Sequence, residues 1–243
     1  MNLIKQIHTY YLKQRFFPDF FSLIINPFYF SRKNLLKHIR YLSVELQGKL
    51  LDFGCGSKPY KELFSNVTEY IGIDVENDGH DHITEEIDLY YDGETIPFED
   101  EIFNSVLVSE VLEHVPDIDK SLGEIRRVLK KDGKLLVTIP FVCPEHEMPF
   151  DFRRYTENGI EDILIKNGFN IVNCNKCGNF VEVLFQLWML YFHSLLYTKN
   201  KYINIFINTI FIFPICLLGL LFSNLLPKKK ELYFNIVILA QKI

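Results

Sequence analysis

Cysteine is scarce in this sequence, and its five positions show no regular spacing. An odd, irregular set argues against a disulfide framework and favours a reducing compartment, so we expect a cytoplasmic protein. Cys174 and Cys177 have C-x-x-C spacing, but no second pair completes a zinc site, and we interpret them as loop cysteines. The segment Met1–Gln6 also lacks the compact apolar run of a secretory signal, so secretion is not expected.

Basic residues are too few and too scattered to form a general nucleic-acid surface. The chain has 26 Lys and Arg against 31 Asp and Glu, a formal charge of −5, so no nucleic-acid partner is expected. Apolar residues are abundant instead: 48% of the chain is hydrophobic and 15% aromatic, which excludes a disordered chain. A length of 243 residues suits one α/β domain with additions.

The stretch Leu50–Tyr60 combines an apolar run, an acid and a glycine turn. Asp52 ends the run, Gly54 and Gly56 follow, and Pro59 stands where a helix would begin. In a parallel α/β sheet this pattern is typical of the first strand entering its crossover, where ligands bind. Glycines there let a ligand approach the backbone. A turn without a ligand would use the same residues, so the stretch alone leaves both interpretations open.

An alternation of strands and helices follows and predicts a mostly parallel, doubly wound sheet. Asp74 ends the second strand about twenty residues past Gly54, where an acid can accept both ribose hydroxyls of an adenosine ligand. Asp132–Gly133 is predicted to be a turn, Thr156 to cap a helix and Gly168 to end it. Strands are expected at 49–53, 69–74, 105–109, 134–140 and 169–172, with a short one ending near 88–89, and helices at 59–64, 117–130 and 156–166.

Five motifs in this order resemble the class I S-adenosylmethionine-dependent methyltransferases, in their broad small-molecule branch. The resemblance covers roughly Lys49–Val172 and implies a seven-stranded, Rossmann-like methyltransferase sheet whose last strand is antiparallel. The motifs are Leu51–Gly56, Ile73–Asp74, Ile96–Phe98, Ser109–His114 and Leu129–Leu135.

The resemblance also assigns residues to the cofactor S-adenosylmethionine. Asp74 would hold the ribose. Lys58 departs from the family pattern, since it stands where the family commonly has a third glycine; a side chain that points away from the cofactor at this position leaves cofactor binding open. A nicotinamide cofactor fits poorly, because G-x-G-x-x-G would need a glycine at Pro59. The remaining cofactor residues are Asp52, Gly54, Cys55 and Gly56 at the methionine end, Asp88 and Leu89 beside the adenine, and Ser109 and Glu110 beside the sulfonium.

Two segments at strand ends offer candidate catalytic residues. Glu113 and His114 follow the fourth strand, and Pro144–Thr156 follows the fifth; His146 is the best candidate base. The alternative for Pro144–Thr156 is a loop held together by acid–arginine pairs. Neighbours on an extended chain point to opposite sides, so His146 with Glu145 and Glu147 is not expected to bind metal, and no metal site is predicted. Candidate acceptor-binding residues are Glu147, Asp151, Arg153, Arg154 and Tyr155.

Both ends of the chain add to the core predicted over 48–178. Residues 1–47 form a helical, aromatic cap in which Leu35, Leu36, Ile39 and Leu42 share one helix face, either packed on the sheet edge or acting as a lid. Residues 179–227 form an apolar helical insertion, and 228–243 return as the last strand. The return excludes a single membrane crossing. It leaves a soluble hairpin, an in-plane or re-entrant hairpin at a membrane, or two spans, which Glu182 and His193 disfavour.

These patterns predict a methyltransferase that acts on a small molecule. We expect O-methylation of a glycan, a lipid-linked compound or another amphiphile; nitrogen and carbon acceptors rank lower. The alternative is a non-catalytic module that retains the fold for cofactor binding or membrane interaction. Segment 180–226 is the candidate contact for a membrane surface or a second copy.

Overall fold

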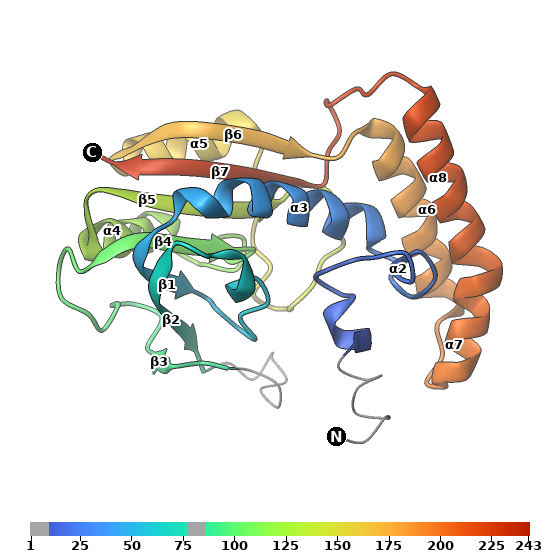
Figure 1. The fold of residues 1–243 in the computed structure, drawn as a ribbon, viewed down its shortest axis with the longest axis horizontal. Helices are drawn as coiled ribbons and strands as arrows, with labels where there is room; N and C mark the ends of the chain where they lie inside the picture. The colour runs from blue at the N-terminus through green and yellow to red at the C-terminus, as the bar shows by residue number, and fades with distance from the viewer. Residues whose placement is uncertain (1–9, 77–85) are drawn as a thin grey trace. The chain divides into compact units, whose positions relative to one another are not determined.

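The computed structural model describes residues 10–76 and 86–243, which divide into two compact units (Figure 1). The helical unit comprises Met1–Lys37 and Lys176–Phe234, and the sheet unit comprises His38–Asn175 and Asn235–Ile243. The polar connection predicted from Glu76 to His82 lies, apart from Glu76, outside the described residues.

A seven-stranded sheet in the order β3-β2-β1-β4-β5-β7-β6 forms the centre of the sheet unit. Strands β1 to β5 pair in parallel and β7 runs antiparallel to β5, which confirms the predicted fold class. The central strands are nearly continuous apolar runs because both of their faces are covered. The strands are β1 (Gly48–Phe53), β2 (Val67–Val75), β3 (Leu89–Tyr91), β4 (Phe103–Ser109), β5 (Leu129–Pro140), β6 (Phe169–Cys177) and β7 (Asn235–Lys242).

Helices cover both faces of the sheet. The C-terminal part of α3 (Tyr29–Leu42) lies on the near face in Figure 1, and α4 (Ile118–Val128) and α5 (Glu157–Lys166) lie behind. The spacings of four, three and four between Ile118, Leu122, Ile125 and Leu129 predict one apolar helix face, and the structure confirms it, since all four residues are buried. The predicted cap of α5 is confirmed, since Thr156 accepts from the amide of Gly159, and α4 begins at a cap that was not predicted, in which Asp117 accepts from the amide of Lys120.

Four predicted elements differ from the structure. The helix expected at 59–64 is only a 3₁₀ turn, η2 (Lys61–Leu63), because too little chain separates the glycine turn from β2. Strand β3 begins, rather than ends, at Leu89. No turn interrupts β5 at Asp132, although its φ of 62° and a register shift mark an irregularity there. Strand β6 continues past Val172, so Cys174 and Cys177 lie in a strand and not in a loop.

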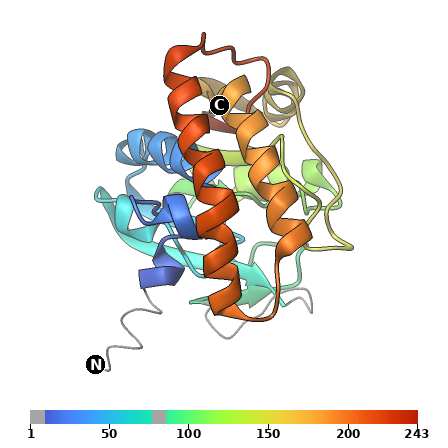
Figure 2. The ribbon, with the colours of Figure 1, turned by 90° about the vertical axis from the view of Figure 1, so that its right-hand side faces the viewer.

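The helical unit is built around a long helical hairpin. Helix α6 (Phe180–Leu196) leads out, and α7 (Lys201–Ile207), the π-helical turn η4 (Asn208–Ile212) and α8 (Phe213–Leu225) lead back beside it (Figure 2). The π-helical turn lies just before Pro214, which has no amide hydrogen to donate to the preceding turn. Two aromatic stacks join the hairpin, Phe185 with Phe222 and Phe192 with Phe211.

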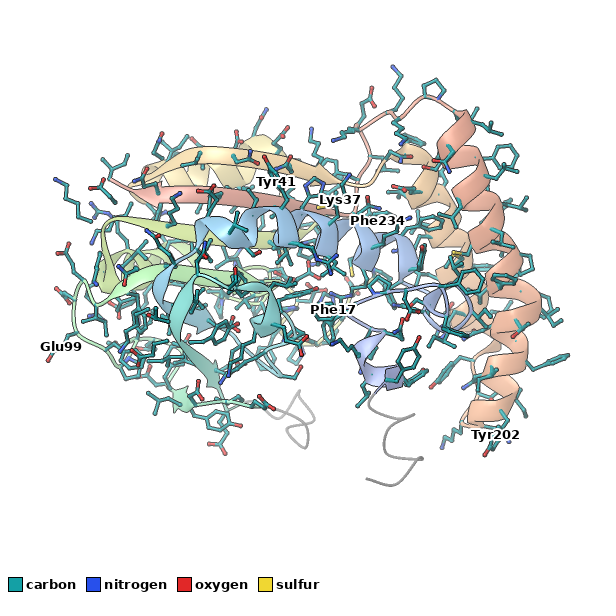
Figure 3. All side chains as sticks on the ribbon, viewed as in Figure 1. Phe17, Lys37, Tyr41, Glu99, Tyr202 and Phe234 are labelled. Carbon is teal, nitrogen blue, oxygen red and sulfur yellow. The ribbon has the colours of Figure 1, made fainter. Side chains whose placement is uncertain are left out.

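Two shorter segments of the N-terminal region complete the helical unit. Helix α2 (Ser22–Ile25) contacts η4 and α8, and Phe30 of α3 lies against Gly219 of α8. The predicted apolar face of α3 is confirmed, since Leu35, Leu36, Ile39 and Leu42 are all buried. Of the residues labelled in Figure 3, Phe234 is 1% exposed, whereas Tyr202 at the hairpin tip and Tyr41 on α3 are 72% and 67% exposed.

Candidate active site

The candidate site residues lie at one edge of the sheet. Strands β1, β2, β4 and β5 are parallel, so their carboxyl ends share that edge. The segments that leave it are Gly54–Lys58, Glu110–Val115 and Phe141–Tyr155. This is the position at which parallel α/β sheets bind ligands.

The glycine turn after β1 is held in place by β2. Gly54 and Gly56 have φ values of 70° and 45°, which glycine adopts without strain. A methyl group on Gly54 would overlap Val111, so the turn lies directly against the segment after β4. A methyl group on Gly56 would meet no atom within 4 Å, so the turn faces open space there. Asp74 accepts from the amide of Gly56 at 2.8 Å and joins the end of β2 to this turn.

Lys58 points into the protein. Its side chain is 2% exposed and its Nζ lies 2.5 Å from Oδ2 of Asp88. The aliphatic part of the Lys58 side chain passes over Gly72, where any side chain would overlap it. Partial burial alone would raise the pKa of Asp88, but the amide of Gly72 and the ammonium of Lys58 lower it. Lys58 and Asp88 therefore form a structural ion pair under the glycine turn.

Asp52 is a buried carboxyl group next to the turn. It is 3% exposed, and the hydroxyl of Tyr70 donates to its Oδ2 at 2.5 Å. Burial raises the pKa of Asp52 to about 7, while the Tyr70 hydrogen bond and the charge of Lys58 oppose that shift.

The segment after β4 is anchored to the next two strands of the sheet, β5 and β7. The amide of Glu110 donates to the carbonyl of Thr138 in β5, and Asn235 of β7 donates to Oε1 of Glu110 at 2.6 Å. Ser109 lies 3.2 Å from the hydroxyl of Thr138. Glu110 has a φ of 58°, a backbone strain of the kind that gathers at functional sites.

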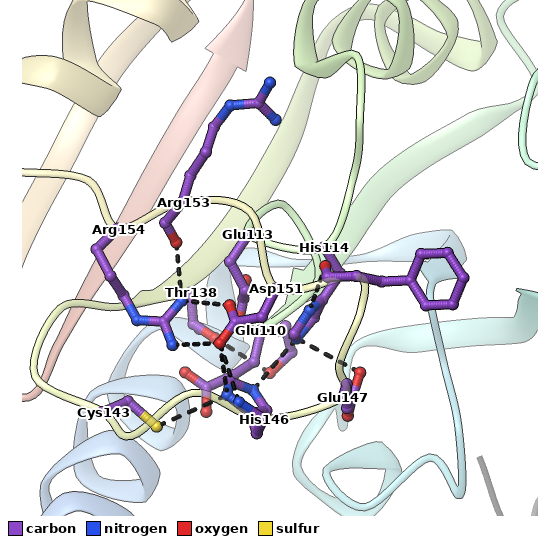
Figure 4. Close-up of polar contacts among 12 residues, drawn as sticks. Glu110, Glu113, His114, Thr138, Cys143, His146, Glu147, Asp151, Arg153 and Arg154 are labelled. Carbon is purple, nitrogen blue, oxygen red and sulfur yellow. Dashed lines mark hydrogen bonds and ion pairs between the residues drawn. The ribbon is translucent and has the colours of Figure 1, made fainter. Parts of the chain in front are cut away.

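Two histidines from different segments meet beside this anchor (Figure 4). Nε2 of His114 lies 3.2 Å from Nε2 of His146, and the rings are nearly perpendicular. Nδ1 of His114 lies 3.0 Å from the carbonyl of Phe150, and Nδ1 of His146 lies 3.2 Å from the carbonyl of Pro144. Oε2 of Glu147 is 3.4 Å from Nε2 of His114.

Glu113 is the buried member of this cluster. Its side chain is fully buried, and among the described residues neither carboxylate oxygen has a hydrogen-bond partner. Its Oε1 lies 3.7 Å from Nε2 of His114. Burial and the nearby charge of Glu110 raise the pKa of Glu113 well above its usual range.

The loop between β5 and α5 is held by its own arginines. Arg154 contacts both oxygens of the buried Asp151, at 2.5 and 2.7 Å, and this pairing lowers the pKa of Asp151. Asp151 in turn accepts from the amide of His146 and lies 3.4 Å from its Nδ1. Arg153 donates to the carbonyls of Val115 and Pro116. Both guanidinium groups thus bind the protein itself, as in the acid–arginine alternative for this loop.

The structure brings most of the predicted site residues together. Glu113, His114, His146 and Glu147 form one cluster, and Asp151 and Arg154 position His146. Tyr155 is buried, and Leu89 and Asp88 begin the β3 edge of the sheet. Sequence reasoning missed Tyr70 and Asn235, which reach Asp52 and Glu110 from other strands. No local pattern marks either residue.

A family model described as "Methyltransferase domain" matches residues 51–137, which include the glycine turn and the segment after β4. The uncharacterized protein MJ0638 of Methanocaldococcus jannaschii is 31% identical over 183 residues, 71% of this chain and 79% of that protein. A shorter match joins the chain to the ubiquinone/menaquinone biosynthesis C-methyltransferase UbiE of Pseudoalteromonas translucida. It is 41% identical over 56 residues, 23% of this chain and 22% of UbiE.

Solved structures share the fold at low sequence identity. One is a S-adenosylmethionine-dependent methyltransferase of Thermotoga maritima, described as a possible histamine N-methyltransferase. It aligns with a TM-score of 0.53 over 99% of this chain and 96% of its own, at 14% identity. At that identity the match establishes the architecture alone.

Proposed function

The chain belongs to the class I S-adenosylmethionine-dependent methyltransferases, and from this premise we propose that it methylates a hydroxyl group of a small amphiphilic molecule. One observation carries the choice of oxygen. The imidazoles of His114 and His146 and the carboxylate of Glu113 converge beside the glycine turn, and an alcohol needs such a group to lose its proton.

The glycine turn and the end of β2 fit the family's cofactor, S-adenosylmethionine. The open space in front of Gly56 allows a ligand to approach the backbone, and Asp74 presents a carboxylate at the end of β2. Lys58 does not obstruct this space, because its side chain is buried against Asp88. The bound cofactor supplies a methyl group already activated by its sulfonium.

The protein's own contribution is alignment, exclusion of water and removal of one proton. Correct orientation alone can supply roughly 7–11 kcal/mol of the barrier in favourable cases. Carbonyl oxygens only accept hydrogen bonds, so Nδ1 of His146 carries its hydrogen toward Pro144 and Nε2 keeps a lone pair. We assign this lone pair as the base that takes the proton from the hydroxyl group to be methylated.

The amphiphilic acceptor is inferred from the surface of the helical unit. Helices α6, α7 and α8 expose large apolar side chains, among them Trp188 at 59%, Phe206 at 64% and Leu225 at 69%. The helical run Tyr202–Leu225 is long and apolar enough to cross a bilayer, and it is followed by Lys228, Lys229 and Lys230. Apolar residues beside a basic cluster suit an anionic membrane surface. We therefore propose peripheral membrane association and an acceptor found there.

The test is a transfer assay with an isotopically labelled methyl donor. Membrane and soluble extracts are incubated with the donor and protein, and labelled products are identified by mass spectrometry. We expect a labelled O-methyl ether in the lipid extract. A label on nitrogen or carbon would overturn the O-methylation, and donor binding without any labelled product would favour the non-catalytic alternative.

His146→Ala tests the site itself. Because His146 lies outside the glycine turn, we expect loss of transfer of 100-fold or more with donor affinity unchanged. Asp74→Ala is the matched control, in which donor affinity should fall instead. Full turnover in His146→Ala would remove this residue from catalysis.

A further inference from the structure

We propose that Glu113, His114 and His146 bind one divalent first-row transition-metal cation, such as Mn²⁺, Co²⁺ or Zn²⁺. Their ligand atoms all lie within 4.8 Å of one another, although the residues come from two segments of the chain. The catalytic role of this cation rests on the function proposed above, whereas its binding does not.

The imidazole tautomers provide the first argument. Nδ1 of each ring faces a backbone carbonyl, of Phe150 for His114 and of Pro144 for His146. A carbonyl accepts but cannot donate, so both Nδ1 atoms carry a hydrogen, and when both rings are neutral both Nε2 atoms keep lone pairs. These lone pairs face each other at 3.2 Å. Two facing lone pairs repel, and a positive charge that both can bind removes the repulsion.

Glu113 provides the second argument, independent of the histidines. Its carboxyl group is fully buried, and within the described residues neither oxygen has a hydrogen-bond partner; its nearest charged contact is Nε2 of His114, at 3.7 Å. A buried carboxylate without a partner is costly and calls for a cation. Arg154 does not fill this role by hydrogen bonding, since its paired contacts go to Asp151. Glu110 and Glu147 add further negative charge nearby.

The distances fit a single ion. Two ligand atoms each about 2.1 Å from one metal ion lie about 3.0 to 3.7 Å apart for angles between about 90° and 125°. The separation of the two Nε2 atoms is 3.2 Å, and Oε1 of Glu113 lies 3.7 Å from Nε2 of His114. Oε2 of Glu147 lies 3.4 Å from Nε2 of His114. At this distance Glu147 can serve as a further ligand or as a base beside the ion.

The surroundings of the histidines match those of metal ligands. Histidine ligands usually donate their second N–H to a carbonyl or carboxylate, which fixes the ring. His114 has the carbonyl of Phe150, and His146 has the carbonyl of Pro144 with Asp151 at 3.4 Å. Two imidazoles with a carboxylate favour transition metals over Mg²⁺, which prefers oxygen ligands.

The cation would change how the acceptor hydroxyl is activated. The hydroxyl oxygen binds the cation, which lowers its pKa, and the proton passes to Glu147. The oxygen would then donate an electron pair to the methyl carbon, and the electrons of the broken carbon–sulfur bond would stay on sulfur, which becomes a neutral thioether. His114 and His146 act in this scheme as ligands, and Glu147 replaces His146 as the base.

The binding test uses the full-length, tag-free chain stripped with a chelator and titrated with Co²⁺, Mn²⁺, Zn²⁺ and Mg²⁺. We expect one Co²⁺ per chain, visible by its d–d absorption, and an upward shift of the melting temperature on the order of 5–10 °C at saturation. Mg²⁺ should bind more weakly than the other three. If none of Co²⁺, Mn²⁺ and Zn²⁺ binds stoichiometrically, the proposal is overturned.

Three variants locate the ion. His114→Ala, His146→Ala and Glu113→Gln should each weaken Co²⁺ binding by 100-fold or more and remove the melting shift. Glu113→Gln is the sharpest of these, because it keeps the shape of the side chain and removes a buried charge. His38→Gln, a histidine outside the cluster, should bind Co²⁺ like the wild type. Unchanged binding in the three cluster variants would place the ion elsewhere and overturn the site.

An activity arm separates this inference from the proposed function. Methyl transfer should stop after chelation and return with Mn²⁺ or Co²⁺. Transfer that continues in chelator would overturn the cation's catalytic role and leave O-methylation by His146 standing. Cation binding without O-methylation of any hydroxyl would overturn the proposed function and leave the cation site standing.

Discussion

Asp52 carries a protonation equilibrium that couples folding to pH. Its pKa is about 7 in the folded protein because the carboxyl group is buried, against about 3.9 in an unfolded chain. The folded state therefore binds a proton more tightly than the unfolded state between these values. Stability from this group is complete below about pH 4 and is lost as pH rises toward 7.

Asp52→Asn should remove this pH dependence. Asparagine does not ionise, and its amide oxygen can still accept from Tyr70. In urea denaturation without cofactor, the wild type should lose stability relative to the variant between pH 5 and 8, by on the order of 2–4 kcal/mol. Tyr70→Phe should move the loss of stability to a higher pH range than in the wild type, because it removes a hydrogen bond that lowers the pKa of Asp52. Parallel pH profiles for wild type and Asp52→Asn would contradict the assignment.

Single residues show both the reach and the limit of sequence reasoning. The sequence identified His114 and His146 separately, because each follows a strand end. Their meeting at 3.2 Å depends on how two loops turn after β4 and β5, which no spacing encodes. For this reason the sequence pattern offered candidate metal ligands only among neighbours along the chain, at 145–147. Likewise Lys58 could be recognised as irregular, but its pairing with Asp88 follows from the position of Gly72 in β2.

Among elements, those with a strong period or a clear cap were predicted well. The α4 stripe and the Thr156 cap of α5 needed only local information. The β6 strand was cut short at Val172 because polar residues follow. As one of the two edge strands of the sheet formed by the described residues, β6 has a strand neighbour on one side only and tolerates Asn173 and Asn175. The short crossover after β1 has no periodic signal, and the predicted helix there was wrong.

Thr156→Ala tests the cap that begins α5 directly after the candidate site loop. The Thr156 hydroxyl accepts from the amide of Gly159, and its loss should lower the free energy of unfolding by about 1 kcal/mol. Thr156→Ser keeps the acceptor and should stay close to wild type in the same chemical denaturation experiment. Equal destabilisation by serine and alanine would show that the methyl group, not the cap, is responsible.

At the scale of the whole molecule, topology was the most predictable property. The order of motifs and the alternation of elements specify a parallel sheet, and the return of Asn235–Lys242 as an antiparallel strand fits the same pattern. The surroundings of the apolar insertion were harder to read, because its polar residues gave no sign of their partners. Glu182 accepts from Asn34, and the buried Gln186 accepts from the amide of Ser31. Their polar groups are satisfied inside the helical unit, which leaves apolar side chains to dominate the exposed surface of the hairpin.

That surface leads to a prediction for the full chain in the presence of lipid. Soluble monomers rarely expose contiguous apolar patches beyond a few hundred Å², so the exposed side chains of α6, α7 and α8 favour burial in a membrane interface. We expect the protein to sediment with vesicles that contain phosphatidylserine and to bind neutral vesicles less well. Replacing Lys228, Lys229 and Lys230 by glutamine should weaken binding to the anionic vesicles by on the order of 100-fold, at about 1 kcal/mol per lysine.

Two glutamate substitutions separate apolar insertion from charge attraction. Trp188→Glu and Phe206→Glu alter exposed side chains, so folding should be little affected while binding to both kinds of vesicle falls. Tyr41→Glu is the matched control, since Tyr41 is 67% exposed but lies outside the hairpin. Protein that stays in the supernatant with every vesicle contradicts membrane association. The chain could also form a dimer in lipid-free solution, and Trp188→Glu or Phe206→Glu could dissociate it. That result would assign the same surface to a second copy of the chain, because an apolar interface and a membrane bury the same side chains.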